Sequence, residues 1–319
     1  MVMQKNKKYD IVGIGNAIVD LIAEVDDSYL EKNSINKGSM SLVDYDVVNR
    51  IGNEVDIVKT ISGGSVANSI VCIAQQNLKT VFIGKVNQDE LGEKFAKGLA
   101  EENVEFKITK SLANKHTARC IILVSTDAER TMNTYLGVSQ ELTEEDIDLN
   151  IIEESSILYL EGYLWDLVNA KKAIKKSIST AINSETKIAF SISDAFCVDR
   201  FREEFIDLVN NSADIIFANE SEIKSLFETN ELSDAIKKCQ DTKKIFAVTL
   251  GDKGAKIIYK NEVVDIKAEV INKLVDTTGA GDLFAAGFLA EYLKTQDLEL
   301  SGKQGVKMAS IIIQQFGAR

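Results

Sequence analysis

Short apolar runs alternate along this chain with longer segments in which apolar residues recur at helical spacing. The short runs predict buried strands at 9–15, 17–25, 80–86, 157–162, 187–193, 214–220 and 245–250. The helical spacing predicts helices at 63–76, 89–102, 166–183, 199–210, 219–239 with a break near Thr229 and Asn230, 280–295 and 301–316. Such alternation is typical of an α/β protein with a mostly parallel sheet covered by helices on both faces.

Two parts of the chain depart from this alternation. Residues 118–126 and 129–137 predict a strand pair around Asp127 and Ala128, and residues 17–42 are strand-rich without a helix between. We expect these segments, about 17–42 and 118–136, to form a smaller sheet that serves as a lid. A hairpin is predicted at 255–267. Because no linker, repeat or low-complexity stretch is present, residues 1–319 are predicted to form a single domain.

Composition narrows the classes of function. The chain has 319 residues, is 45% hydrophobic and carries a net charge of −12. An acidic chain repels polyanions, so neither nucleic acid nor a membrane surface is expected as a partner. No apolar run approaches the roughly 20 residues of a membrane span, and the four scattered cysteines favour a reduced core. We expect a soluble, cytoplasmic monomer or homodimer that binds small molecules.

The segment GIGNAIVD, residues 13–20, follows the first predicted strand and contains a G-x-G pattern. A dinucleotide-binding G-x-G-x-x-G motif would need a glycine in place of Ile18, and a helix in place of the second strand. We therefore reject a Rossmann site. Two polar residues remain among apolar neighbours, Asn16 and Asp20. A buried carboxylate needs partners whether it binds ligand hydroxyls or serves the fold alone, so both interpretations of Asp20 stay open.

Two strand-to-helix junctions carry polar residues. Gly63 and Gly64 precede an apolar helix and Asn68 follows one turn later, which favours close approach of the backbone to a ligand. Asn219 and Glu222 have the spacing of a capping box. Taken alone, that spacing favours a helix cap. The alternative is a carboxylate at the end of a parallel strand that orders Mg²⁺, directly or through water.

The segment DTTGAGD, residues 276–282, stands where a predicted helix begins. A helix cap accounts for the threonines and for Asp282, but not for Gly279 and Gly281 around Ala280, because glycine within a helix costs about 1 kcal/mol relative to alanine. Unhindered backbone N–H groups at a helix N-terminus form an anion site. A carboxylate beside a phosphate can accept the proton of an attacking alcohol, so this segment predicts phosphoryl transfer.

Other features exclude competing chemistries. The sequence contains no G-x-x-x-x-G-K-[ST] motif, which excludes a P-loop nucleotide site. The single histidine, His116, argues against histidine triads and multi-histidine metal sites. The segment VTLGDKG, residues 248–254, is by itself typical of an ordinary approach to a hairpin.

Together these segments resemble the ribokinase/adenosine kinase-type (PfkB) carbohydrate kinases, in the same order and along essentially the whole chain. DTTGAGD is similar to the family's C-terminal signature, and GGSVAN at 63–68 is similar to its N-terminal signature. NESE at 219–222 resembles the N-x-x-E motif of the family, and VTLGDKG resembles its nucleotide-site strand. The resemblance implies a ribokinase-like αβα sandwich with a mostly parallel central sheet and a small β-sheet lid.

The resemblance also implies roles for individual residues. Asp282 would be the catalytic base, the amides of Gly279, Ala280 and Gly281 would hold the γ-phosphate, and Arg130 on the lid would neutralise the transferring phosphate. Residues expected to bind the hydroxyls of a ribose or sugar are Asn16, Asp20, Gly63, Gly64 and Asn68. Residues expected at the ATP site are Asn219, Thr249, Gly251 and Gly254, with Glu222 positioning Mg²⁺. The sequence leaves open whether a monovalent cation acts near Asp276 and Thr278.

The acceptor is also inferred from resemblance. The segments around Arg130 and at 157–166 look like a bacterial branch labelled adenosine kinase. Residues that would then contact a purine, or simply form core, are Met132, Thr134, Tyr163 and Leu164. We expect ATP-dependent phosphorylation of a primary hydroxyl, the 5′-hydroxyl of adenosine, to give AMP. A sugar kinase of the ribokinase or fructokinase type and a catalytically silent nucleoside-binding protein stay open as alternatives.

Overall fold

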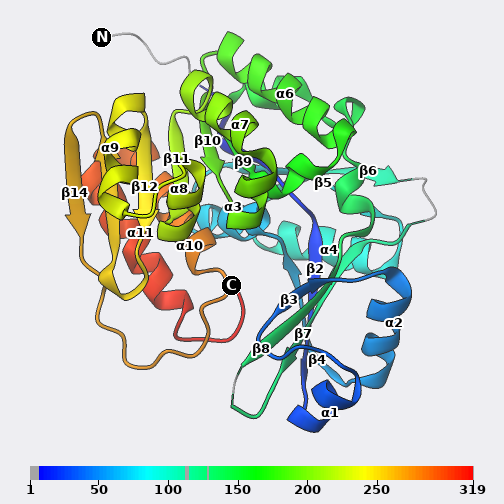
Figure 1. Cartoon of the computed structure of the whole chain (residues 1–319). Coiled ribbons are helices and arrows are strands. Elements are labelled where there is room, and N and C mark those ends of the chain that lie inside the picture. Colours follow the sequence, from blue (N-terminus) through cyan, green and yellow to red (C-terminus); the bar gives the residue numbers. More distant parts are fainter. Residues whose placement is uncertain (1–6, 112–114, 128, 319) are drawn as a thin grey trace.

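The computed structural model describes residues 7–111, 115–127 and 129–318, and Figure 1 shows their arrangement around two sheets. Within this part of the chain, the larger sheet has nine strands in the order β14-β13-β12-β11-β10-β9-β1-β5-β6. Neighbouring strands from β12 to β6 are parallel, and β13 and β14 form an antiparallel edge. The strands are β1 (Tyr9–Ile14), β5 (Thr80–Asn87), β6 (Glu105–Ser111), β9 (Ser155–Glu161), β10 (Lys187–Ser191), β11 (Ile215–Asn219), β12 (Ile245–Thr249), β13 (Ala255–Tyr259) and β14 (Glu262–Ile266).

Helices cover both faces of this sheet, because successive strand residues point to opposite sides and both sides are apolar. In β1, for example, Val12 packs in one apolar layer and Ile11 in the other. The first layer contains α5 (Leu149–Glu153), α6 (Val168–Asn183), α7 (Ala195–Asn211), α8 (Glu220–Leu226) and α9 (Leu232–Thr242). The second contains α3 (Ser65–Ala74), α4 (Glu90–Glu101), α10 (Ala280–Thr295) and α11 (Leu298–Ile312). The predicted αβα sandwich with a mostly parallel sheet is confirmed.

The second sheet has five strands in the order β3-β8-β7-β2-β4 and projects from one end of the larger layers (Figure 1). Its strands are β2 (Ile18–Glu24), β3 (Met40–Leu42), β4 (Ile57–Gly63), β7 (Ala118–Val124) and β8 (Arg130–Tyr135). Helices α1 (Asp27–Lys32) and α2 (Tyr45–Glu54) pack on one face through Leu30, Val48 and Ile51. The opposite face carries a separate apolar cluster that includes Ile122 and, at its margin, Met132.

The structure corrects the prediction for this second sheet. The segment 17–42 does contain a helix, α1, and the edge strand β4 lies outside both predicted segments. Sequence patterns miss β4 because its central residues, including Lys59 and Thr60, are exposed, so it has no buried run. Ala128, at the turn predicted between the paired strands, lies outside the described residues. The other connections include short 3-10 helices η1 (Gly137–Glu141), η2 (Glu144–Asp146), η3 (Gly162–Asp166) and η4 (Gly251–Lys253).

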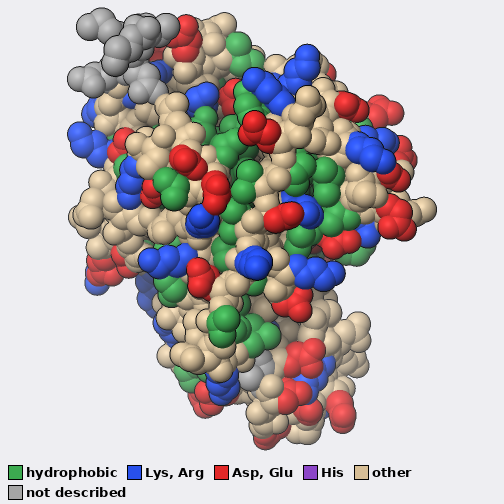
Figure 2. Space-filling model, turned by 90° about the vertical axis from the view of Figure 1, so that its left-hand side faces the viewer, with side chains coloured by type: hydrophobic (Ala, Val, Ile, Leu, Met, Phe, Trp, Pro, Cys, Tyr) green, Lys and Arg blue, Asp and Glu red, His purple; other side chains and the backbone are tan. Residues whose placement is uncertain are grey.

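Charge is distributed in small groups over the surface. Figure 2 shows acidic and basic side chains interspersed on one face, so the net charge of −12 does not gather there into one acidic field. All four cysteines are buried and free, as the sequence predicts. None of the helices among the described residues is long and apolar enough to cross a membrane.

Candidate active site

A cavity of about 470 Å³ lies at the carboxyl ends of β10, β11 and β12, beside the start of α10. Open parallel sheets commonly bind ligands at this edge, because strand ends and helix N-termini meet there. The predicted site residues that line the cavity are Met132, Tyr163, Asn219, Glu222, Thr249, Gly279, Gly281 and Asp282. Residues from both halves of the sequence therefore meet in one place. The cavity lies between the larger sheet and the second sheet, which contributes Met132 from β8.

The start of α10 has the open backbone that an anion requires. Gly279 is the N-cap residue with φ of 77°, and a Cβ there would overlap Ala318, so the fold itself needs this glycine. Gly281 differs, because a Cβ at that position would meet no atom within 4 Å. Among the described residues, the backbone N–H groups of Gly281 and Asp282 have no protein acceptor. These two amides therefore point to an anion site at the helix N-terminus.

Asp282 is oriented by two side chains from α3. The Ser65 hydroxyl donates to Oδ1 at 2.6 Å, and Nδ2 of Asn68 donates to Oδ2 at 3.0 Å. Burial raises the pKa of Asp282, while these two donors lower it. The carboxylate is thus held in one orientation and is more basic than an exposed aspartate. Helices α3 and α10 are further tied by Ser69, whose hydroxyl donates to the Asp282 carbonyl oxygen at 2.8 Å.

Asn219 and Glu222 form the complete capping box that their spacing predicts. The Asn219 side chain accepts from the Glu222 backbone N–H, and the Asn219 N–H donates to Glu222 Oε2 at 2.9 Å. The helix cap accounts for the local geometry. It does not account for the position of the carboxylate, which is only 8% exposed and lines the cavity. Burial raises the pKa of Glu222 to about 7, and the bond from the Asn219 backbone lowers it.

The side chains around the cavity offer few ligands for the expected Mg²⁺. The described residues contain no group of three or more His, Cys, Asp or Glu side chains that could hold a metal ion alone. The cavity lining nevertheless contains two carboxylates, Asp282 and Glu222, and no lysine or arginine. A polyphosphate in this cavity would need a cation to offset that negative charge. The residues present therefore fit Mg²⁺ that is bound mainly by phosphate and water oxygens, beside one carboxylate.

Arg130 and Asp276 form a buried ion pair between the second sheet and the segment before α10. Their side chains are 7% and 4% exposed, and Nη2 lies 2.9 Å from Oδ2. Asp276 also accepts from the N–H groups of Thr278 and Gly317, at 3.0 Å each. Desolvation lowers the pKa of Arg130, and the charge of Asp276 raises it. The guanidinium supplies a positive charge beside Asp276, where the sequence left a monovalent cation open.

The residues expected at ligand hydroxyls lie just behind the cavity. Gly64 has φ of 104° and approaches the Asn16 carbonyl so closely that a Cβ would overlap it. A Cβ on Gly63 would likewise overlap the Asp20 carboxylate. These glycines therefore let the start of α3 lie against β2 and the turn before it. Asn68 is buried and reaches the cavity through Asp282, whereas Asn16 is 3% exposed and bonded to other protein groups.

The remaining predicted residues are divided between the cavity and its surroundings. Thr249 lines the cavity, whereas Gly251 and Gly254 lie in the turn after β12, where the Leu250 N–H donates to the Gly254 carbonyl oxygen. Thr134 is buried, and its hydroxyl donates to the Cys120 sulfur at 3.2 Å. Leu164 packs in the core and not in the cavity. Tyr163 lines the cavity, and its hydroxyl donates to the Ser193 carbonyl oxygen at 3.1 Å.

Sequence reasoning missed several residues that line the cavity. The polar ones are Ser65, Ser191, Ser193, Thr277 and Thr278, and the apolar ones are Phe217, Ala218, Ala247 and Phe284. Ser65 stands at a helix start inside the GGSVAN segment, which was a usable signal. Ser191, the last residue of β10, and Ser193 just after it were a weaker signal of the same kind. The apolar residues carried no signal, because inward-facing residues of strands and helices look alike whether they face a core or a cavity.

The fold and the site together define a phosphotransferase of ribokinase-like architecture. Residues 10–319 match the pfkB family of carbohydrate kinases, and the chain belongs to this family, which uses ATP. An adenosine kinase from Sinorhizobium meliloti is 40% identical, with a TM-score of 0.89 over 98% of this chain and 96% of that one. A probable sugar kinase protein from Rhizobium etli is 38% identical, with a TM-score of 0.91 over 98% and 95%. The adenosine kinase of Saccharomyces cerevisiae is 26% identical over 332 residues, covering 96% of this chain and 95% of the other.

Proposed function

We propose that this kinase transfers the γ-phosphoryl group of ATP to a primary hydroxyl, and that the hydroxyl is the 5′-OH of adenosine. The observation that carries the proposal is the pairing of two open amides at the start of α10 with Asp282, oriented by Ser65 and Asn68. An anion site and an adjacent oriented base are the two groups that phosphoryl transfer to an alcohol needs.

In the proposed reaction, the Asp282 carboxylate accepts the proton of the attacking hydroxyl. The hydroxyl oxygen then forms a bond to the γ-phosphorus, and the bond from that phosphorus to the β–γ bridging oxygen breaks, so ADP leaves. The open amides of Gly281 and Asp282 would stabilise the charge that develops on the transferring group, whereas the Ala280 amide predicted for this role donates to the Thr277 carbonyl oxygen. Arg130, which pairs with Asp276 outside the cavity lining, would add its positive charge from there. The raised pKa of Asp282 makes it a stronger base, and the bonds from Ser65 and Asn68 keep it oriented.

ATP would lie along the side of the cavity formed by Asn219 and Thr249, with Gly251 and Gly254 in the adjoining turn. Glu222 would hold Mg²⁺ through its water ligands. When bound, Mg²⁺ neutralises charge on the phosphates. The helix N-terminus supplies the fixed donors on the opposite side.

The acceptor would lie between the second sheet and α3. Asn16, Asp20, Gly63, Gly64 and Asn68 are not among the residues that line the cavity. Asp20 and the backbone of Gly63 and Gly64 would bind ribose hydroxyls, whereas the side chains of Asn16 and Asn68 are bonded to Glu161 and Asp282. The cavity wall also contains Met132, Tyr163 and Phe217, with Thr134 just behind. An apolar and aromatic wall suits a nucleobase better than a bare sugar. The similarity to adenosine kinases, at up to 40% identity in the comparisons above, supports the same choice.

A turnover screen tests the acceptor directly. ADP release is measured with adenosine, other nucleosides, ribose and fructose, each at saturating ATP and Mg²⁺. We expect the highest kcat/KM with adenosine. Turnover with sugars alone would favour the second candidate, a sugar kinase, which the resemblance to the Rhizobium etli protein supports. If none of these acceptors is turned over but a nucleoside still binds, the protein is a catalytically silent binding protein.

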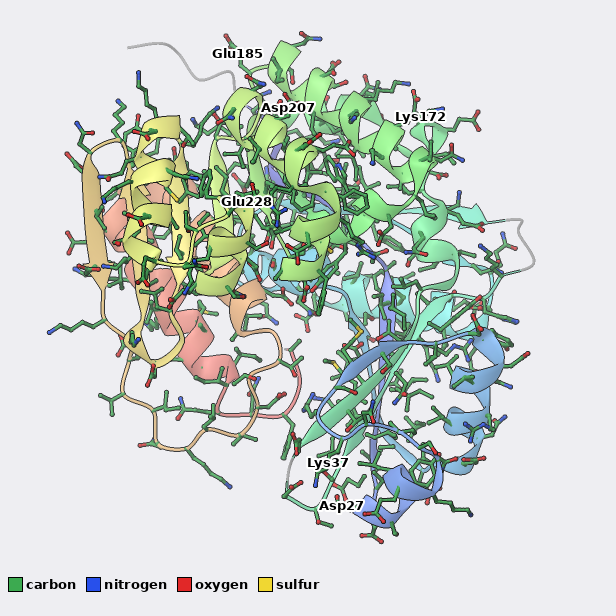
Figure 3. The ribbon with its side chains drawn as sticks, viewed as in Figure 1. Asp27, Lys37, Lys172, Glu185, Asp207 and Glu228 are labelled. Atoms are coloured by element: carbon green, nitrogen blue, oxygen red, sulfur yellow. The ribbon has the colours of Figure 1, made fainter. Side chains whose placement is uncertain are left out.

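Asp282→Asn tests the base separately from ATP binding. The amide keeps the shape of the side chain but cannot accept the proton, so kcat should fall about 10²–10⁴-fold while the Kd for ATP stays within about twofold. Asp207→Asn, on the outside of α7 where Figure 3 labels it, is the matched control and should keep full activity. An Asp282→Asn enzyme with a near-normal rate would show that another group takes the proton.

A further inference from the structure

The chain crosses between the two sheets close to a single buried carboxylate. Residues 15–17 lead out of β1 into β2, and Gly64 leads back from β4 into α3. Glu161 is the last residue of β9, the strand that pairs with β1. Its side chain is 1% exposed, and it does not line the cavity. Because the carboxylate is buried, it must take its hydrogen bonds from the protein groups around it.

The two carboxylate oxygens of Glu161 accept hydrogen bonds from two different segments that join the sheets. Oε1 accepts from the backbone N–H of Asn16 at 2.9 Å and from its Nδ2 at 2.7 Å, which holds the outgoing segment. Oε2 accepts from the backbone N–H of Val66 at 3.0 Å, which holds the returning segment at the first turn of α3. Gly15 has no side chain to interfere, since a Cβ there would lie 2.7 Å from Oε2. One carboxylate therefore joins both segments.

A third segment that joins the two sheets also contacts Asn16. After β8 the chain returns through η1, where the Ser139 hydroxyl lies 3.0 Å from Asn16 Oδ1 and 2.6 Å from the Leu136 carbonyl oxygen. Its single proton serves one of these acceptors at a time. Asn16 thus lies between Ser139 and Glu161, and three of the segments that join the two sheets contact one buried network.

This network ends next to the group that orients the proposed base. Val66 directly follows Ser65 and is two residues before Asn68, and these two residues bind the two oxygens of Asp282. We infer that Glu161 is a positioning residue: it holds the crossings between the sheets so that an acceptor bound against the second sheet meets Asp282 in register. The inference rests on the proposed function, because it acts through the acceptor and Asp282.

The Glu161 carboxylate is held by hydrogen bonds from Asn16 and Val66, and we call this set of bonds the clamp. Within the described part of the chain, no ion pair involves Glu161, so its partners are the three N–H donors above. Burial raises its pKa to about 7, and the bonds from Asn16 and Val66 lower it. A buried carboxylate without a cation is costly, and the three hydrogen bonds from Asn16 and Val66 offset part of that cost.

Glu161→Gln breaks the clamp on one side only, because the amide keeps one acceptor oxygen but turns an NH₂ group toward the other donor. Steady-state rates are measured with ATP and with the acceptor that the screen identifies. We expect the KM for the acceptor to rise about tenfold or more, as the loss of one charged hydrogen bond implies. The KM for ATP should stay within about twofold, because Asn219 and Thr249 lie on other strands. A purely structural defect would lower kcat through loss of active enzyme and leave both KM values unchanged.

Asp214→Asn is the matched control. Its carboxylate accepts from the Ile188 backbone N–H at 2.8 Å, at the opposite end of the strands. This variant should leave the KM for the acceptor unchanged. If Glu161→Gln does not fold, Ser139→Ala removes a weaker contact of the same network and should raise that KM about threefold. Acceptor kinetics within about twofold of wild type in the folded variant would overturn the inference.

Hydrogen exchange without substrates separates this inference from the proposed function. Glu161→Gln should speed exchange of the Val66 amide about tenfold or more, and Asp214→Asn should not. If wild type turns over no acceptor but Val66 exchange responds, the proposed function fails and the clamp stands. If wild type is active and neither exchange nor the KM for the acceptor responds, the clamp fails alone.

Discussion

Replacing Glu222 with glutamine should stabilise the protein and weaken its use of Mg²⁺ at the same time. Burial raises the pKa of Glu222 to about 7 from an ordinary value of 4.5. At about 1.36 kcal/mol per pKa unit, ionised Glu222 costs the folded state roughly 3 kcal/mol above pH 8. Glutamine removes this cost but satisfies only one of the two Asn219 donors, which loses about 1–1.5 kcal/mol. The net gain is about 1–2 kcal/mol.

The sign of this effect depends on pH. Because the pKa of Glu222 is raised in the folded state, its stabilising contribution is complete below about pH 4.5 and is lost as the pH rises through about 7. An unfolding entropy of about 2.1 cal/mol/K per residue gives about 0.7 kcal/mol/K for this chain, so Glu222→Gln should raise Tm by about 2 °C at pH 8.5. The gain should disappear near pH 5.

The assay pairs thermal denaturation at pH 5 and pH 8.5 with a Mg²⁺ titration of the rate. Glu222→Gln should need about tenfold more Mg²⁺ for half-maximal turnover, as the loss of one charged partner implies. Glu220→Gln, two residues earlier in the same helix and outside the cavity lining, is the control and should change neither quantity. An equal Tm shift at both pH values would refute the burial argument. An unchanged Mg²⁺ requirement would leave Glu222 as a helix cap only.

Other substitutions test the anion site at the start of α10 and the buried ion pair between Arg130 and Asp276. Gly281→Ala should leave Tm equal or slightly higher, because the added Cβ meets no protein atom. The same Cβ would crowd the bound anion, so kcat should fall about tenfold in rate measurements. Gly279→Ala should lower stability by more than about 1 kcal/mol in denaturant titrations, because φ is positive there and Ala318 is in contact. Arg130→Lys should lower kcat about 10–100-fold, because lysine keeps the charge but loses the guanidinium fork; a rate within about twofold would remove Arg130 from the site.

Local patterns predicted most elements within a few residues of their bounds. The inner strands of the larger sheet were recognisable because they are buried on both faces and form continuous apolar runs in the sequence. The edge strands β3 and β4 were missed, as was β6, because they lack such runs. The start of α10 was also recognisable, since Gly279 and Gly281 are more glycines than a helix cap uses.

The sequence by itself determined that a helix with an open, glycine-containing N-terminus and an aspartate stands after the last strands. Only the tertiary structure decided what orients that aspartate. Ser65 and Asn68 are separated from Asp282 by 217 and 214 positions, and Glu161 joins crossings 145 and 95 positions away. Local patterns record which way a residue faces over one or two turns. Contacts over such separations depend on strand order, here β9 beside β1, and strand order is a property of the whole folded sheet.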